Sequence, residues 1–485
     1  MRTRRHMAWV LSGAILATGA AHADVAISKK PTVNMNCSNG VCSPTASNAV
    51  LNTTDLTNML ASGDVKVTTG SGATNVIVKD SVGWATTSRL TLDANQSVTI
   101  DKPVMVTGTG AVTITTNDGG SGGDLIFDGK GNVTFWDLTS SLIVNGNSYT
   151  LVGDIATLAS DIANNPSGFY ALANDCDASA DGTYGAAPVT TNLSGTFDGL
   201  NHKVDEMHIV ASDALVGLFE SSNGVLRDVQ VTNATIQSDA GNGGVLVGSG
   251  GTIINCFASG TLTFSSGPIA GGLAGSGEGV LDRSHADVKI SVGNSVNVGG
   301  LVGVSGYTIT SSYATGNVKA GDSSFAGGLV GSGGTILESY ATGNVSAGDS
   351  SYVGGLVGLT GDINNSYATG SVKGGASAIV GGFSGQIEGD VESSYSMGLV
   401  AGEDSVGFLG TREGAEPNFD YWDTDTSGKG RKQGCGGHSC GRGFKGLNTN
   451  KFQAGLPDGF DASVWAENPN INDGLPYLIA NPPPK

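Results

Sequence analysis

The side chains that could do chemistry in this sequence are three carboxylates and one carboxamide that return at one position of a repeat. Asn294, Asp322, Asp349 and Asp404 occupy equivalent places, and paired carboxylates are what both glycoside cleavage and calcium binding require. The equivalent residue Ala376 has no carboxylate, and no Lys, Arg or His recurs beside the column. The Gly-Asp-Ser context is typical of a turn. We therefore interpret the column as turn residues, with a cation between successive carboxylates as the alternative.

Two short segments partly match calcium loops. GGSGGDLIF at 119–127 fits one copy of the calcium-binding nonapeptide, but the next nine residues place Val133 where Asp is required. DTDTSG at 423–428 begins like an EF-hand loop, whose position 12 would be Gly434 rather than Glu. Neither segment supplies a complete ligand set. We predict no cofactor and no catalytic residue, and calcium stays as the one metal alternative.

Cysteines and histidines offer no nucleophilic site. The spacing of Cys37 with Cys42, and of Cys435 with Cys440, predicts two local disulfides. The two other cysteines, at 176 and 256, lie in apolar stretches and are expected to be buried thiols. No histidine outside the first 23 residues is near a Ser or Cys with the surroundings of a nucleophile.

The N-terminal segment has the layout of a secretory signal. Three arginines precede an apolar run, and the small residues Ala21 and Ala23 predict cleavage after Ala23. We expect export through the inner membrane to the cell surface or medium, with the periplasm as the alternative. No later stretch is long and apolar enough to predict a membrane span.

The charge balance bears on the class of partner. The net charge is −19, and removal of three N-terminal arginines leaves 43 acidic against 21 basic residues, or −22. Such a surface repels a nucleic-acid polyanion, so no nucleic-acid partner is expected. Glycans and cell-surface proteins remain candidate partners, and the sequence does not indicate an oligomeric state.

A repeat of 27–28 residues positions these side chains. An aromatic column consists of Phe257, His285, Tyr313, Tyr340, Tyr367 and Tyr395. A glycine column consists of Gly244, Gly271, Gly299, Gly327, Gly354 and Gly381. Glycines in each unit exclude a helical repeat, and the short β-branched runs predict strands. We expect the paired glycines to turn corners with positive φ and to let neighbouring backbones approach each other.

The fold predicted from this pattern is all-β, a single-stranded parallel β-helix. One repeat unit buries too few apolar side chains to offset the entropy of ordering its backbone, so the units must stack. The aromatic column then has two interpretations. It is either a ladder that packs between rungs, which we favour, or a stripe on which sugar rings stack if it faces outward.

The chain is expected to divide as follows: signal peptide 1–23; linker with a local disulfide 24–50; irregular solenoid coils 51–152; connecting segment 153–212 with a short helix near 154–163; regular repeats 213–410; loop with a local disulfide 411–441; and a C-terminal cap over the last coil 442–485.

The repeat resembles a known family motif. GGLVG followed by I-x-x-S-Y-A-T-G-x-V is similar to the GLUG repeat of bacterial exported proteins, and flanking segments resemble filamentous-haemagglutinin-like adhesins of Gram-negative bacteria. The resemblance implies a right-handed parallel β-helix that is displayed or released. The chain lacks the NPNG-type motif of two-partner secretion and the HExxH motif of GLUG-bearing peptidases.

We therefore expect a non-catalytic, exported, adhesin-like β-solenoid. The alternatives are a β-helical carbohydrate-active enzyme of the polysaccharide lyase or hydrolase type, and a structural remnant of a larger secreted adhesin.

Overall fold

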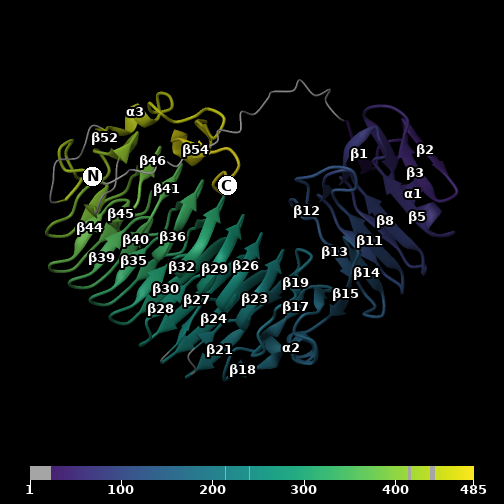
Figure 1. The fold of residues 1–485 in the computed structure, drawn as a ribbon, viewed down its shortest axis with the longest axis horizontal. Helices are drawn as coiled ribbons and strands as arrows, with labels where there is room; N and C mark the ends of the chain where they lie inside the picture. The colour runs from purple at the N-terminus through teal and green to yellow at the C-terminus, as the bar shows by residue number, and fades with distance from the viewer. Residues whose placement is uncertain (1–22, 213–214, 240, 413–416, 437–442, 485) are drawn as a thin grey trace, which may run out of the picture. The chain divides into compact units, whose positions relative to one another are not determined.

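The computed structural model describes residues 23–212, 215–239, 241–412, 417–436 and 443–484. Over these ranges the chain forms a parallel β-solenoid of about 15 turns (Figure 1). It divides into two compact units, the first up to Gly131 together with Ile143–Gly146, the second formed by Asn132–Leu142 and the residues from Asn147 onward. The sequence predicts one elongated β-helix without such a division. No helix in the described ranges combines the length and apolarity needed to cross a bilayer.

The first unit stacks short strands into three ladders. Their strands are, in sheet order, β12 (Leu125–Phe127), β9 (Val98–Ile100), β6 (Ala73–Val78), β1 (Ala23–Ser28) and β4 (Ala49–Asn52); β2 (Met35–Ser38), β3 (Val41–Pro44), β5 (Val65–Thr68), β8 (Arg89–Asp93) and β11 (Ala111–Thr115); and β10 (Val104–Val106) and β7 (Val82–Trp84). Two further strands, β13 (Val133–Phe135) and β14 (Ser141–Val144), lie near the division between the units.

The sequence predicts that residues 24–50 are a linker. In the structure they form strands of the first unit instead. Val25 and Ile27 alternate with the half-buried Asp24 and Ala26 and point into the core of the first unit, where both are fully buried. This alternation is the signature of a half-buried strand. The antiparallel hairpin β2–β3 continues the ladder of β5, and the disulfide between Cys37 and Cys42 joins its two strands.

A helix in the first unit has no counterpart in the expectations. Helix α1 spans Thr53–Leu60, and the side chain of Asn52 caps it by accepting a hydrogen bond of 2.8 Å from the Thr54 backbone N–H. Leu56 and Leu60 are fully buried, because residues four apart share one helix face.

The second unit consists of three sheets, which we name by their features. The aromatic sheet contains β17 (Cys176–Asp177), β18 (Thr183–Tyr184), β20 (Lys203–Asp205), β21 (His208–Ala211), β24 (Gln230–Ser238), β27 (Phe257–Phe264), β30 (His285–Val292), β33 (Tyr313–Ala314), β34 (Val318–Lys319), β37 (Tyr340–Ala341), β38 (Val345–Ser346), β42 (Tyr367–Ala368), β43 (Val372–Lys373), β47 (Tyr395–Ser396), β48 (Val400–Ala401), β51 (Asp420–Asp423) and β52 (Phe444–Leu447).

The long sheet contains β15 (Asn147–Val152), β16 (Phe169–Leu172), β19 (Thr196–Asp198), β23 (Phe219–Arg227), β26 (Val247–Ile254), β29 (Ala274–Asp282), β32 (Val302–Thr310), β36 (Val330–Leu337), β40 (Val357–Thr360), β41 (Ile363–Asn364), β45 (Ser384–Ile387), β46 (Val391–Glu392), β49 (Leu409–Arg412) and β50 (Pro417–Asn418). The short sheet contains β22 (Leu215–Val216), β25 (Asn242–Gly243), β28 (Ile269–Gly271), β31 (Asn297–Gly299), β35 (Phe325–Gly327), β39 (Tyr352–Gly354) and β44 (Ile379–Gly381).

Helix α2 (Ile155–Asn164) lies where helical spacing predicts one, shifted by a residue. The side chain of Asp154 caps it by accepting a hydrogen bond of 2.7 Å from the Thr157 backbone N–H. Leu158 and Ile162 face the core of the second unit.

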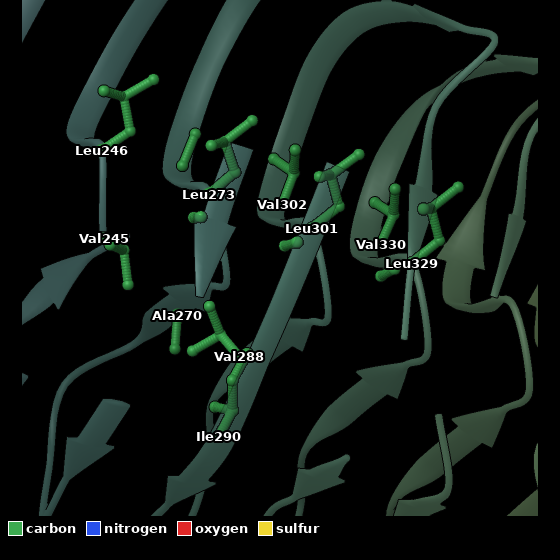
Figure 2. Close-up of a cluster of buried hydrophobic side chains, with 14 of the residues drawn as sticks. Val245, Leu246, Ala270, Leu273, Val288, Ile290, Leu301, Val302, Leu329 and Val330 are labelled. Carbon is green, nitrogen blue, oxygen red and sulfur yellow. The ribbon is translucent and has the colours of Figure 1, made fainter. Parts of the chain in front are cut away.

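The core of the second unit is built from side chains that repeat from rung to rung. Each rung is one 27–28-residue turn of the solenoid. Figure 2 shows leucines of successive rungs pointing in one direction; they are Leu246, Leu273, Leu301 and Leu329, all fully buried. Burial of one such side chain contributes about 1.5–3 kcal/mol. Because each rung presents the same surface, the next rung fits it without a gap.

The repeated glycines serve close approach rather than positive φ. Gly271, Gly299, Gly327, Gly354 and Gly381 pair in register across the short sheet. A Cβ on Gly327 would collide with the Val330 carbonyl oxygen and lie 2.7 Å from the Val357 Cα of the next rung. None of these five glycines has positive φ. The expectation that they turn corners in the left-handed region is therefore wrong.

A left-handed corner lies at another column, which contains no glycine. Its members follow the long sheet and have φ between 46° and 60°; they are Asp228, Asn255, Arg283, Ser311, Glu338, Asn365, Ser393 and Phe419. Left-handed backbone costs a non-glycine residue roughly 1 kcal/mol, so the stacked rungs on either side must enforce this corner.

The segment 411–441 is not only a loop. It contributes β51, where Tyr421 pairs with Tyr395 and extends the aromatic column by one rung. The C-terminal region adds β52, α3 (Thr449–Phe452), and the antiparallel pair β53 (Trp465–Ala466) and β54 (Tyr477–Leu478). We call residues 448–484 the C-terminal segment. Two 3-10 turns, at Ala178–Asp181 and Asn472–Gly474, complete the described elements.

Candidate binding surface

The aromatic column forms a stacked ladder on the outside of the solenoid. Phe257 pairs with His285, His285 with Tyr313, and Tyr313 with Tyr340. Their ring centroids are 4.5, 4.6 and 4.8 Å apart, and the Tyr313 and Tyr340 rings are tilted by only 1°. The column continues with Tyr367 and Tyr395 at 4.6 and 5.0 Å. The rings point away from the main core, because Tyr340, Tyr367 and Tyr395 belong to a separate apolar cluster.

Because the rings stack on one another, their faces are not accessible to a sugar ring. A sugar ring binds an aromatic side chain by lying on its face, and here the rungs above and below occupy both faces of each inner ring. Only ring edges are directed outward. Of the two interpretations of the column, packing between rungs is the one that this geometry supports.

Burial in the ladder shifts the titration of its members. Desolvation lowers the pKa of His285 from 6.5 to about 4, with the nearby Asp287 carboxylate acting weakly in the opposite direction. Desolvation raises the pKa of Tyr313 to about 12, and Asp287 adds to this shift. Both side chains therefore stay neutral at pH 7, and the inner ladder carries no charge.

The C-terminal segment covers the part of the ladder that contains Tyr367 and Tyr395. Phe452, Phe460 and Trp465 pack on Tyr395, with ring centroids 5.4, 6.3 and 5.9 Å away, and Trp465 also contacts Tyr367 at 6.1 Å. These tyrosines are fully buried. The sequence predicts a cap over the last coil, but the segment packs on the side of the solenoid along the ladder.

Hydrogen bonds tie this segment to several successive rungs. Trp465 Nε1 donates to Asn365 Oδ1 at 2.9 Å, and Tyr395 donates its hydroxyl to the Pro476 carbonyl at 2.7 Å. Asn481 Nδ2 donates to the carbonyl of Ser312 at 3.3 Å. The segment thus runs back along the ladder toward Tyr313, whose ring is only partly buried. Phe257 and His285 lie beyond its end.

Recurring serines are used inside the structure. The backbone N–H of each donates to the hydroxyl oxygen of the next, from Ser284 to Ser312, Ser339, Ser366 and Ser394, at 3.1–3.3 Å. All five are fully buried. The series ends at Asp420, whose carboxylate accepts from the Ser394 N–H at 3.1 Å, and burial raises the pKa of that carboxyl well above its ordinary value. These hydroxyls hold backbone together and are not available as nucleophiles.

The acidic column is used in the same way. The side-chain oxygen of Asn294 accepts from the Asp322 N–H at 2.9 Å, Asp322 accepts from the Asp349 N–H at 2.9 Å, and Asp349 accepts from the Ala376 N–H at 2.7 Å. Asp404, the fourth member, lies on an exposed turn. This is the geometry of turn residues. Among the described residues no three Asp, Glu, His or Cys side chains are grouped as a metal site.

The two partial calcium loops are closed by their own hydrogen bonds. In the first, Asn117 bridges to Gly123, accepting its N–H at 2.7 Å and donating to its carbonyl at 2.9 Å. In the second, the carboxylate of Asp423 is fully buried and accepts from the Asp425 N–H and from the Thr449 hydroxyl.

The remaining predicted residues have the following places. Cys176 and Cys256 are buried, and desolvation raises the pKa of their thiols to about 11 and about 12. Cys440 and Ala21 lie outside the described residues, so the pairing with Cys435 and the cleavage site stay predictions. Ala23 begins β1.

The outer face of the aromatic sheet carries a hollow in the part that the C-terminal segment leaves uncovered. Beside Phe257 and His285 lies a hollow of about 470 Å³, lined by Thr261, Thr263, Lys289, Ile290, Ser291, Asn317 and Lys319. The polar members point outward because they alternate with buried residues such as Ile290 along the strands. These lysines are not evident in the repeat pattern, because they do not recur at one column in every rung.

The repeat geometry can now be compared with known proteins. Residues 349–373 match the family model "the GLUG motif". The chain carries a GLUG motif. This segment contains β39, β42 and Tyr367, so the motif describes one rung of the solenoid with its ladder tyrosine.

Two other proteins are similar to longer parts of this chain than the GLUG motif covers. Halomucin of Haloquadratum walsbyi is 31% identical over 241 residues, which is 46% of this chain and 2% of that protein, so this chain spans a very small part of its length. A solved structure from Bacteroides ovatus, provisionally named an immunoglobulin A1 protease, has a TM-score of 0.40 and 18% identity, covering 69% of this chain and 93% of that one.

Proposed function

We propose that this protein is exported and acts as a non-catalytic, adhesin-like β-solenoid that makes extracellular or cell-surface contacts. The observation that carries the proposal is how the recurring polar side chains are used. The Ser and Asp columns donate to and accept from the backbone of neighbouring rungs, so they serve the shaft rather than a reaction. What the repeat leaves for a partner is its outer face.

The GLUG motif and the solenoid fold support the proposal because both fit a protein that presents a repeated surface. Export rests on the basic and apolar N-terminal segment and its small residues at 21 and 23.

The test has two parts on the full chain. Protease added to intact cells should cleave the protein if it is displayed outside. The purified protein should bind cells or glycans on an array without changing them. Release of reducing ends from a bound polysaccharide would overturn the non-catalytic proposal, and complete protection in intact cells with cleavage only after outer-membrane disruption would overturn surface display.

A further inference from the structure

From the outer face of the aromatic sheet we infer that it binds a linear anionic polysaccharide, with uronate or sulfate groups, along a stripe through Lys289, Lys319 and Lys373. This inference rests on the proposed function and names its ligand class. The hollow of about 470 Å³ contains the first two lysines, and the third lies further along the same face.

The register places Lys319 and Lys373 in a line along the solenoid axis, with Lys289 offset to one side of that line. Lys319 pairs with Ser346, and Ser346 pairs with Lys373, so these two lysines lie two rungs apart. At about 4.8 Å a rung their backbones are roughly 10 Å apart. Lys289 lies one rung before Lys319 and two residues to the side, because Ser291 pairs with Lys319. All three side chains are exposed.

The charge of this face is opposite to that of the chain. The net charge of the sequence is −19. From β27 to β43, the outward positions of the aromatic sheet hold three lysines and a single carboxylate, that of Asp287. None of the three lysines forms an ion pair with a carboxylate in the described part of the chain. Three cations without partners, on a protein this acidic, indicate an anionic ligand.

Polar groups between the lysines suit a polyhydroxylated chain. Thr261, Thr263 and Ser291 line the hollow with hydroxyl groups, and Asn317 adds an amide. The Asn317 side-chain oxygen already accepts from the Asn344 N–H at 2.9 Å, which leaves its NH₂ group to donate to a ligand. The position therefore offers both donors and acceptors beside the cations, which is what sugar hydroxyls require.

The flanks of the stripe favour a narrow ligand over nucleic acid. Asp287 lies on one side between His285 and Lys289, and the Asp322 and Asp349 turns lie on the other, beyond Lys319. A single polysaccharide strand contacts the lysines alone. A nucleic-acid duplex is wide and densely charged, so its phosphates would approach these carboxylates as well.

The experiment compares the whole protein with two triple variants of equal charge change. The first, K289Q/K319Q/K373Q, removes the stripe. The control, K102Q/K130Q/K432Q, removes three exposed lysines elsewhere. The probes are heparin, polygalacturonate, neutral dextran and a duplex DNA oligonucleotide, with affinity measured across a range of salt concentrations.

We expect the wild type and the control to bind heparin or polygalacturonate and to ignore dextran. The affinity of the stripe variant for these acidic polysaccharides should fall at least tenfold. The slope of log K against log salt concentration should become shallower by about two. Circular dichroism of both variants establishes that each is folded.

Equal binding by the stripe variant and the control would overturn the stripe. Tighter binding of DNA than of either acidic polysaccharide would overturn the ligand class. If the wild type binds cells but neither acidic polysaccharide, the inference fails and the proposed function stands. If it binds neither cells nor glycans, both fail.

Discussion

At the scale of single residues, the repeat is held by side chains that reach from one rung to the next. Ser339 is fully buried; its hydroxyl accepts from the Ser312 N–H at 3.1 Å and donates to the Leu337 carbonyl at 2.8 Å. A polar residue is required here, since the site is fully buried and an apolar residue would leave a buried N–H unpaired.

Ser339→Ala should therefore destabilise the second unit by about 1–3 kcal/mol, because it leaves the Ser312 N–H without a partner in a fully buried site. The measurement is the midpoint of urea unfolding followed by circular dichroism. Ser371→Ala is the matched control, since Ser371 is exposed and its side chain lies on the outer face. Equal midpoints for the two variants would contradict the role of the serine series.

His285 makes the ladder sensitive to acid. Its pKa is about 4 in the folded protein, below the ordinary value of 6.5, because the neighbouring rings desolvate it. As the pH falls from about 7 to about 4, the unfolded chain takes up a proton that the folded chain does not, so stability decreases over this window. Below pH 4 both forms are protonated and the decrease from this residue stops.

The variant His285→Tyr places the residue type of the next rung in this position and should remove that part of the pH dependence. We expect the difference in unfolding midpoint between pH 7 and pH 4 to be smaller than in the wild type. A difference of unchanged size would mean that groups other than His285 determine the acid sensitivity between pH 7 and pH 4.

At the scale of elements, corners and covering segments decide which strands can stack. The short sheet turns into the long sheet at the repeated glycines, where the chain passes within contact distance of its own carbonyl three residues later. No side chain fits at this place, whatever its φ. This is why the glycine column persists through rungs in which neighbouring residues vary.

Gly327→Ala should destabilise the protein by about 2–4 kcal/mol, since the added methyl group collides with the Val330 carbonyl and with the next rung. Gly361→Ala is the control, because a methyl group there meets only the Gly334 carbonyl at 3.5 Å. Thermal unfolding of both variants checks this. A Gly361→Ala variant that is as unstable as Gly327→Ala would contradict it.

The C-terminal segment is attached through its aromatic side chains. Trp465→Ala removes the contacts to Tyr367 and Tyr395 and the hydrogen bond to Asn365, so attachment should weaken by about 3–5 kcal/mol. Limited proteolysis should then cleave within 448–484 while the solenoid stays intact. Trp136→Ala changes an exposed tryptophan, and its digestion pattern should match the wild type. Resistance of Trp465→Ala to cleavage would contradict the attachment.

At the scale of the whole molecule, periodicity determines how much of the structure is predictable. The aromatic and glycine columns could be read from the sequence because each rung must fit its own copy, which forces the same residue type at the same place. The solenoid follows from that fit, as does the ladder of rings from Phe257 to Tyr395.

What does not repeat could not be read in the same way. The C-terminal segment joins Trp465 to Asn365, 100 residues away, through contacts made once. Helix α1 is only eight residues long and lies between strands. The lysine stripe depends on three rungs that differ from the others, so a consensus of the repeat averages it away.

The most direct test of the account is the distance between two outer positions that the register places in one line. Thr261 pairs with Lys289, and the line continues through Asn317 and Asn344 to Ser371, four rungs from Thr261. Spin labels on cysteines at 261 and 371 should give one narrow distance near 19 Å, four times the strand spacing, broadened only by the label arms. A mean distance above about 30 Å, or a spread without a peak, would contradict stacking of the rungs and with it the proposed surface.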